Sequence, residues 1–199
     1  RVQAEWGDLQ ADVFAAWLAP QGRGAPAASL SAGHSHDLPD CSKSLVGLVC
    51  FDGRSHLAGL SASWSPRGWP MQLQGAWLSQ LERGALYSNN GDVSYRGRNQ
   101  GGWADVNVTL ARGWQTGLRI EQVSTSHRLN GPGATAVSLD AGLTPNQAVR
   151  RQAVQGGWLA RPGLRLMAEA GHEQSALGHR RWAGLRLAGS VDDVWSTSW

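Results

Sequence analysis

Three short stretches decide the fold: Ser65-Pro66-Arg67-Gly68-Trp69-Pro70, Ala111-Arg112-Gly113-Trp114 and Ala160-Arg161-Pro162-Gly163. All three have the composition of tight turns, in which Gly and Pro supply the backbone angles that the chain needs to reverse. On both sides of each stretch, apolar and polar residues alternate, as in a β-strand with one apolar face. The sequence therefore predicts three β-hairpins with almost no loop.

The opposite ends of these hairpins have a different character. There the chain runs through long polar segments rich in Gly, Ser, Asn and Pro, at 20–55, 84–100 and 128–148. Short turns on one edge of a sheet and long loops on the other are typical of an up-and-down barrel in a bacterial outer membrane. We therefore expect an all-β, antiparallel up-and-down transmembrane β-barrel over residues 1–189, with short periplasmic turns and long extracellular loops. Residues 190–199 would form a strand end or a tail.

Period-two alternation supports about eight strands of the length that a tilted membrane strand requires. An even number also returns both termini to the turn side. In a barrel the apolar positions would face lipid, whereas in a water-soluble β-sandwich they would be buried. These positions include Leu60, Leu73, Val106, Val108, Leu118, Ile120, Leu164, Leu166, Leu185 and Leu187. A sandwich has no reason to keep every short turn on one edge, so the barrel is favoured.

Length and charge narrow the class of protein. A chain of 199 residues fits one domain, and 18 Lys plus Arg against 15 Asp plus Glu give a net charge of only +3. The chain also has no run of basic residues. It therefore lacks the positively charged surface that nucleic-acid binding requires. No apolar run is long enough for a transmembrane helix. The absence of an initiator Met and of a signal peptide fits a processed exported chain or a fragment of a longer one.

Tryptophan is unusually abundant, with 11 Trp against two Phe and two Tyr. Trp is favoured at a membrane interface, where one end of the side chain is apolar and the other is wet. We expect two aromatic belts, as in membrane barrels. Trp64, Trp69, Trp114 and Trp158 would form the belt near the short turns, and Trp17, Trp77, Trp103 and Trp182 the belt near the long loops.

Charged residues on the polar face of the strands are nearly balanced. An eight-stranded barrel is just wide enough for its side chains to fill it, so we expect these charges to pair in a plugged lumen. The acids are Asp12, Asp105, Glu121 and Glu169, and the bases are Arg119, Arg165 and Arg186.

Two cysteines and one histidine cluster lie in the segment 20–55. We expect Cys41 and Cys50 to form a disulfide in an oxidising compartment, although two buried thiols are the alternative. His34, His36 and Asp37 have the spacing of metal ligands, yet no third strong ligand is fixed by spacing and loop histidines are more often solvated. We assign no metal site and no cofactor.

The end of the last strand adds a family signal. Trp182-Ala183-Gly184-Leu185-Arg186-Leu187-Ala188-Gly189 has the aromatic, glycine and hydrophobic spacing of a barrel's terminal strand, and the sequence closes on Trp199. The chain resembles the small Gram-negative outer-membrane barrels of the OmpA transmembrane-domain and OmpX type. The resemblance implies an integral protein of the bacterial outer membrane. Its partners would be outer-membrane lipid and lipopolysaccharide, with an extracellular ligand or other envelope proteins at the loops.

Four functions stay open at this point. The leading one is a structural, surface-interaction or receptor role carried by the loops. The second is the C-terminal part of a larger export or uptake porin, the third a barrel enzyme that modifies lipid A, and the fourth a secreted β-sandwich binding module. For the enzyme, a catalytic triad could be drawn from Ser126, His127 and Asp140, or from His34, Asp92 and Ser94. The motifs of the lipid A-modifying families are missing, so we do not expect an enzyme.

Overall fold

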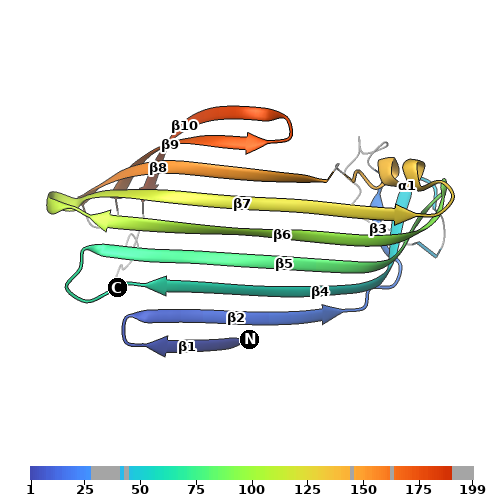
Figure 1. Ribbon diagram of the computed structural model, residues 1–199, viewed down its shortest axis with the longest axis horizontal. Coiled ribbons are helices and arrows are strands. Elements are labelled where there is room, and N and C mark those ends of the chain that lie inside the picture. The colour runs from blue at the N-terminus through green and yellow to red at the C-terminus, as the bar shows by residue number, and fades with distance from the viewer. Residues whose placement is uncertain (28–40, 43–44, 144–145, 162–163, 190–199) are drawn as a thin grey trace, which may run out of the picture.

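The computed structural model describes residues 1–27, 41–42, 45–143, 146–161 and 164–189, which form one large antiparallel sheet (Figure 1). The strands are β1 (Val2–Trp6), β2 (Leu9–Leu18), β3 (Arg23–Pro26), β4 (Leu48–Trp64), β5 (Met71–Ser88), β6 (Gly91–Thr109), β7 (Trp114–Asn130), β8 (Gln147–Arg161), β9 (Leu164–Ser175) and β10 (Gly178–Gly189). A 3-10 turn (Ala111–Gly113) precedes β7, and a short helix α1 (Ala134–Asp140) lies between β7 and β8. Every strand except β3 lies on one path, β1-β2-β4-β5-β6-β7-β8-β9-β10, and β3 pairs with β4.

The up-and-down antiparallel order is confirmed. Each of the three short turns joins neighbouring strands of the path, β4 to β5, β6 to β7 and β8 to β9. The eight alternating segments correspond to β2 and to β4 through β10, while β1 and β3 are additional. The ten strands described form an open sheet, with β1 and β10 at its edges, and not a closed barrel of eight.

The predicted loop at 84–100 is wrong. β5 continues to Ser88 and β6 begins at Gly91, so only a two-residue turn joins the two strands. The polar composition misled because Asp92, Ser94, Arg96 and Arg98 fill one face of β6, while Leu86, Val93 and Tyr95 keep period two on the other face of the two strands. β4 likewise begins inside the predicted loop 20–55, at Leu48.

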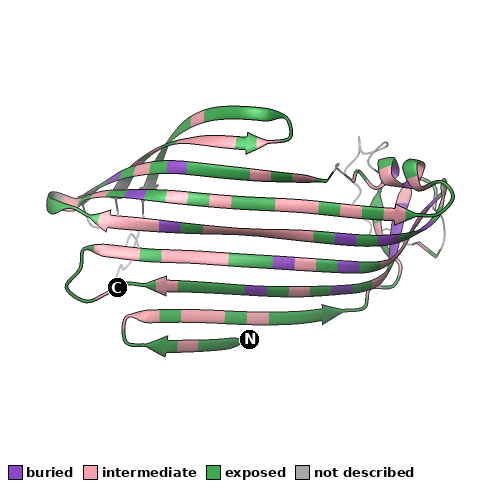
Figure 2. Ribbon diagram, in the orientation of Figure 1, coloured by how far each residue is buried: buried purple, intermediate pink, exposed green. Residues whose placement is uncertain are grey.

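The inner face of the sheet, defined as the face that α1 covers, holds the hydrophobic core. The core gathers at the end of β4, β5 and β6 far from the short turns, where Figure 2 shows buried residues close to α1. Its members are Ala27, Val49, Phe51, Leu86, Val93, Tyr95 and Val137. The other face is called the outer face below.

Helix α1 is anchored to the β5–β6 turn by polar contacts. Asp140 accepts hydrogen bonds from Ser88 Oγ at 2.7 Å and from Asn90 Nδ2 at 2.8 Å. Gly133 starts the helix with φ 77°, and a Cβ there would lie 2.6 Å from the Asn90 carbonyl oxygen. A glycine is therefore required at this position, both for its conformation and for the close approach. Val137 of the helix is completely buried.

The predicted disulfide is confirmed. Cys41 and Cys50 are bonded, with their Cα atoms 6.1 Å apart, and Cys50 lies on β4. The bond therefore ties the segment before β4 to the sheet itself. Among the described residues, no helix is long and apolar enough to cross a membrane.

Candidate functional site

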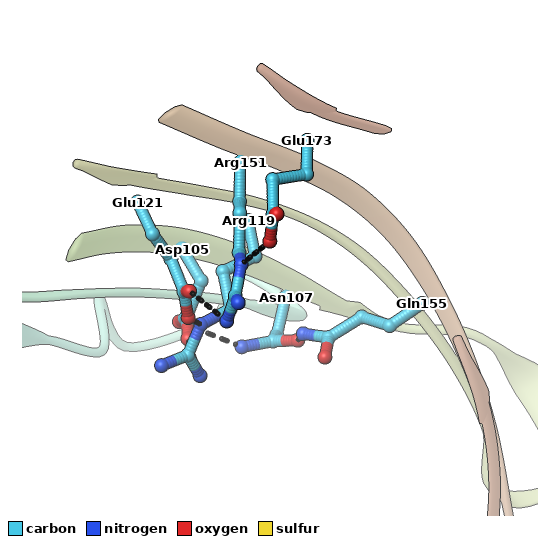
Figure 3. A network of polar contacts seen from close by, with 7 residues as sticks. All are labelled: Asp105, Asn107, Arg119, Glu121, Arg151, Gln155 and Glu173. Carbon is cyan, nitrogen blue, oxygen red and sulfur yellow. Dashed lines mark hydrogen bonds and ion pairs between the residues drawn. The ribbon is translucent and has the colours of Figure 1, made fainter. Parts of the chain in front are cut away.

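A network of charged and amide side chains covers the inner face of the sheet near the short turns (Figure 3). Four strands supply it, because the register of β6, β7, β8 and β9 places their inward-facing polar positions side by side. The members are Asp105, Asn107, Arg119, Glu121, Arg151, Gln155 and Glu173.

Arg119 is the centre of the network. Its Nε lies 2.6 Å from Glu121 Oε1, and its Nη1 lies 3.7 Å from Asp105 Oδ2. The guanidinium also stacks 4.6 Å above the ring of Trp103. Asp105 is the Cα partner of Arg119 across β6 and β7, and its side chain is only 7% exposed. A buried carboxylate held against a cation in this way depends on that cation for its stability.

Arg151 extends the network toward β9. Its Nε lies 2.5 Å from Glu173 Oε2, and its Nη1 lies 3.9 Å from Glu121 Oε2. The prediction missed this pair because the alternation on β8 and β9 was followed only from residue 153 and as far as residue 170. One step of period two from residue 153 leads to Arg151 on β8, and two steps from Glu169 lead to Glu173 on β9, its Cα partner.

Two amides complete the shell around Asp105. Asn107 Nδ2 donates to Asp105 Oδ1 at 3.0 Å, and Gln155 Nε2 donates to Asn107 Oδ1 at 2.5 Å. The carboxylate therefore accepts from a neutral donor on one side and faces a cation on the other. Both contacts stabilise the charge of this buried carboxylate.

The remaining predicted lumen residues are arranged differently. Asp12 lies apart from the network and pairs with Arg1 Nε at 2.7 Å. Glu169 and Arg186 line the same groove as the network, but neither forms an ion pair with another described residue. The side chain of Arg165 lies outside the described part of the structure.

The network lines a groove of about 690 Å³. Inward-facing residues of both β5 and β10 contribute to its walls, among them Gln72, Gln74, Trp182 and Arg186. The sheet therefore curls until strands five places apart on the path face the same space. A groove of this polarity suits water and small polar solutes.

The candidate catalytic residues that the structure describes are not assembled into a site. Ser126 and His127 are consecutive on a strand, so their side chains point to opposite faces. Asp140 is engaged with the β5–β6 turn, and His127 Nδ1 lies 3.0 Å from the hydroxyl of Tyr95. Asp92 and Ser94 both lie on the outer face of β6. Within the described residues no group of three His, Cys, Asp or Glu side chains could hold a metal ion. His34, His36 and Asp37 lie outside these residues.

Tyr95 on β6 and His127 on β7 form a pair on the inner face, farther from the short turns than the network. They lie at the same height along the strands as outward-facing arginines of β6 and β7. Burial, together with the charge of Glu82, raises the pKa of Tyr95 to about 12. Burial lowers the pKa of His127, with Glu82 opposing the shift. A neutral imidazole can accept the hydrogen bond from the tyrosine hydroxyl, so both shifts favour the observed contact.

The outer face near the short turns is apolar and uncovered. The ten residues that the sequence predicted to face lipid lie together on this face, and none of them is buried. Seven are exposed, up to 81% for Leu185. Soluble proteins rarely expose apolar surface of this extent. This face therefore requires either a partner that covers it or an apolar medium around it.

The tryptophans divide between the two faces. Trp6, Trp64, Trp114 and Trp158 lie on the outer face beside the short turns, where Trp114 and Trp158 stack with ring centroids 6.0 Å apart. Trp69 lies in a short turn, while Trp17 and Trp77 are on the outer face farther along the strands. Trp103 and Trp182 project inward, unlike the expected belt, because period two places them with Asp105 and Glu169.

Comparison with known proteins finds no matching family model, no similar curated protein and no similar solved structure.

Proposed function

We propose that the protein is an integral β-barrel protein of the bacterial outer membrane, with a structural or surface-interaction role carried by the end that bears α1. The observation that carries this proposal is an inversion of polarity along the strands. Near the short turns, apolar side chains face outward and charges face inward. Beyond this part, arginines face outward and the hydrophobic core faces inward.

The boundary between the two parts can be traced strand by strand. We call the turn half the part of each strand between the short turns and the first outward-facing arginine, and the loop half the rest. These arginines are Arg54, Arg83, Arg98, Arg128, Arg150 and Arg181, on β4, β5, β6, β7, β8 and β10. No acidic side chain of the described strands faces outward in the turn half.

The dimensions of the turn half fit a bilayer. On β4 the outward-facing positions from His56 to Trp64 span eight residue steps, or about 26 Å of strand at roughly 3.3 Å per step. Tilting such a strand by about 40° gives a band of about 20 Å, close to the apolar band of about 25 Å on outer-membrane barrels. A β-sandwich would instead bury these positions.

Refolding into bilayers tests the proposal. The full chain, diluted from denaturant into phosphatidylcholine vesicles, should gain β-sheet circular dichroism and resistance to protease. Lipids brominated on their acyl chains should quench its tryptophan fluorescence, because Trp64, Trp77 and Trp158 face outward in the turn half. Folding to a monomer in buffer without detergent or lipid, with no quenching by brominated lipid, would contradict a membrane location.

A specific observation also favours the second function, a part of a larger outer-membrane barrel. All eight pairings on the path from β1 to β10 are antiparallel, so strand direction alternates along it. The path contains nine strands, and β1 and β10 therefore run in the same direction. Direct pairing of β1 with β10 would be parallel, whereas single-chain outer-membrane barrels close with an even number of antiparallel strands.

A second copy of the chain does not resolve the mismatch. Rotation about the membrane normal keeps every strand direction, so both edges of the copy run the same way as β1 and β10. Either β1 leaves the edge of β2, or an odd number of further strands lies between β1 and β10. Val2, Ala4 and Trp6 of β1 face outward and Gln3 and Glu5 inward, as on the other strands. This pattern favours a β1 that stays in the sheet and a larger barrel.

Disulfide trapping in vesicles distinguishes the two ways of closing the barrel. Ala4 and Ala11 are Cα partners, so A4C with A11C should cross-link if β1 stays on β2. Pairs that combine A183C on β10 with V13C, A15C or W17C on β2 should not cross-link. Efficient trapping of a β10–β2 pair, with loss of the β1–β2 product, would instead support an eight-stranded barrel formed by this chain alone.

A further inference from the structure

Four arginines form a continuous row across the outer face of the sheet. Arg54 is the Cα partner of Arg83, Arg83 of Arg96, and Arg96 of Arg128, on β4, β5, β6 and β7. All four are exposed. Neighbouring strands lie roughly 4.8 Å apart, so the row presents four guanidinium groups over about 15 Å.

Without counter-charges, such a row lowers the stability of the sheet. Like charges directly opposite one another on adjacent strands destabilise the pair, and this row contains three such contacts in succession. None of the four arginines forms an ion pair with a described residue. The outward-facing carboxylates closest in register are Asp52, one row farther from the turns, and Asp92, two rows farther.

Asp52 is already engaged by other groups. Its Oδ2 accepts from the Tyr87 hydroxyl at 3.1 Å, and its Oδ1 accepts from the backbone N–H of Gly22. Asp92 is the Cα partner of Tyr87 on the neighbouring strand and lies beyond Asp52 from the row. The row is therefore a strip of positive charge whose neutralisation the described residues do not provide.

The position of the row indicates what neutralises it. It borders the apolar turn half, whose last outward-facing positions on β4 and β5 are His56 and Leu81. If the turn half lies in the bilayer, as the proposed function requires, the row lies at the level of the lipid headgroups. Guanidinium groups bind phosphate in bidentate geometry, which makes Arg better suited than Lys to this task.

We propose that Arg54, Arg83, Arg96 and Arg128 bind the phosphate groups of a phosphorylated glycolipid, such as lipid A, in the leaflet that surrounds the loop half. The inference rests on the proposed membrane location. It adds a specific ligand class and a binding surface of four residues to that location. Adjacent phosphates would bridge neighbouring arginines and convert their mutual repulsion into attraction.

The proposal predicts that one double variant, R83Q/R96Q, behaves differently in two membranes. In phosphatidylcholine vesicles, R83Q/R96Q should unfold at the same or a higher urea concentration than the wild type, because repulsion in the row falls. In vesicles that also contain bis-phosphorylated lipid A, the wild type should gain stability and the variant should lose most of that gain. The affinity for lipid A should fall about ten-fold or more, since charge-assisted hydrogen bonds are lost.

Three controls make the test decisive. R180Q/R186Q removes two exposed arginines from the inner face of β10 and should respond to lipid A like the wild type. Dephosphorylated lipid A should stabilise neither protein, and inorganic phosphate in phosphatidylcholine vesicles reports binding of the free anion. An equal lipid A response in R83Q/R96Q and the wild type, or stabilisation by inorganic phosphate alone, overturns the proposal. If the chain inserts into neither kind of vesicle, the membrane location itself is wrong.

Discussion

The turn half and the loop half are built from the same strands with opposite polarity. On β5, Leu73 and Trp77 face outward in the turn half while Gln74 faces inward. Thirteen residues beyond Leu73 on the same strand, Leu86 is buried on the inner face, and Arg83 faces outward. One strand thus has the polarity pattern typical of membrane barrels at one end and that typical of water-exposed sheets at the other.

The difference separates two sources of stability. The loop half has its own hydrophobic core, sealed by α1, and does not depend on an apolar medium outside. The turn half exposes apolar side chains outward and keeps ion pairs inward, so its stability depends on the medium around it. Substitutions in the two halves should therefore respond differently to lipid.

Truncation of the core should have the largest effect. Phe51 is 2% exposed and packs edge-on against Tyr95, with ring centroids 5.8 Å apart. Phe51→Ala should lower the free energy of unfolding by about 3 to 5 kcal/mol in detergent and in vesicles alike. Urea unfolding followed by tryptophan fluorescence measures this loss. An effect that appears in only one of the two media would show that the loop half does not have an independent core.

A charge on the outer face should discriminate between the halves. Leu118→Arg places a cation in the turn half and should cost about 2 to 4 kcal/mol if the residue lies near the bilayer midplane. Asn130→Arg on the same strand and face lies in the loop half and should be nearly neutral. The fraction of protein that folds into vesicles is the readout. Equal yields for the two variants would remove the distinction between the outer surfaces of the halves.

Sequence patterns were sufficient for the turn half and insufficient for the loop half. Near the short turns, apolar residues such as Leu60, Val106 and Leu118 alternate regularly with polar ones and face outward. This regular alternation predicts the strands there. In the loop half the outward positions carry Arg and Ser, and Gly84 and Gly97 interrupt the inner apolar pattern. The segment therefore has the composition of a loop although it is extended strand.

The sequence predicted only part of the inner network, again because period two was informative while strand ends were not. The face of a residue follows from period two, which correctly grouped Asp105, Arg119 and Glu121. Strand ends do not follow from composition, so Arg151 and Glu173 were left out. The openness of the sheet depends on pairing between distant strands, and no local pattern encodes that pairing.

Removal of the central cation should have a smaller effect than either change above. Arg119→Ala leaves the buried carboxylate of Asp105 without its cation and should cost about 1 to 3 kcal/mol. Arg186→Ala, on the same groove but without a described ion pair, should cost less. Asp105→Asn in the R119A background should restore part of the loss, because a neutral amide needs no counter-charge. Without such rescue in urea unfolding, the cost would come from lost packing on Trp103 and not from the unpaired charge.

The smallest expected effect is a pH dependence at the boundary between the two halves, where His127 adjoins Arg128 on β7. Burial lowers the pKa of His127 below its ordinary value of 6.5, so the folded state favours the neutral ring. The unfolded chain then binds more protons than the folded one as the pH falls past 6.5. The contribution of His127 to stability is therefore fully present above that pH and is lost as the pH falls through the lowered pKa.

The contact with Tyr95 explains why protonation is costly here. The hydroxyl lies 3.0 Å from His127 Nδ1, and a protonated ring could no longer accept its hydrogen bond. The stability difference between the wild type and H127Q should thus shrink between pH 7.5 and pH 5, as measured by urea unfolding at each pH. A difference that stays constant across this range would mean that His127 is equally free to protonate in the folded protein, and the inner surface at this boundary would then be wetter than its burial implies.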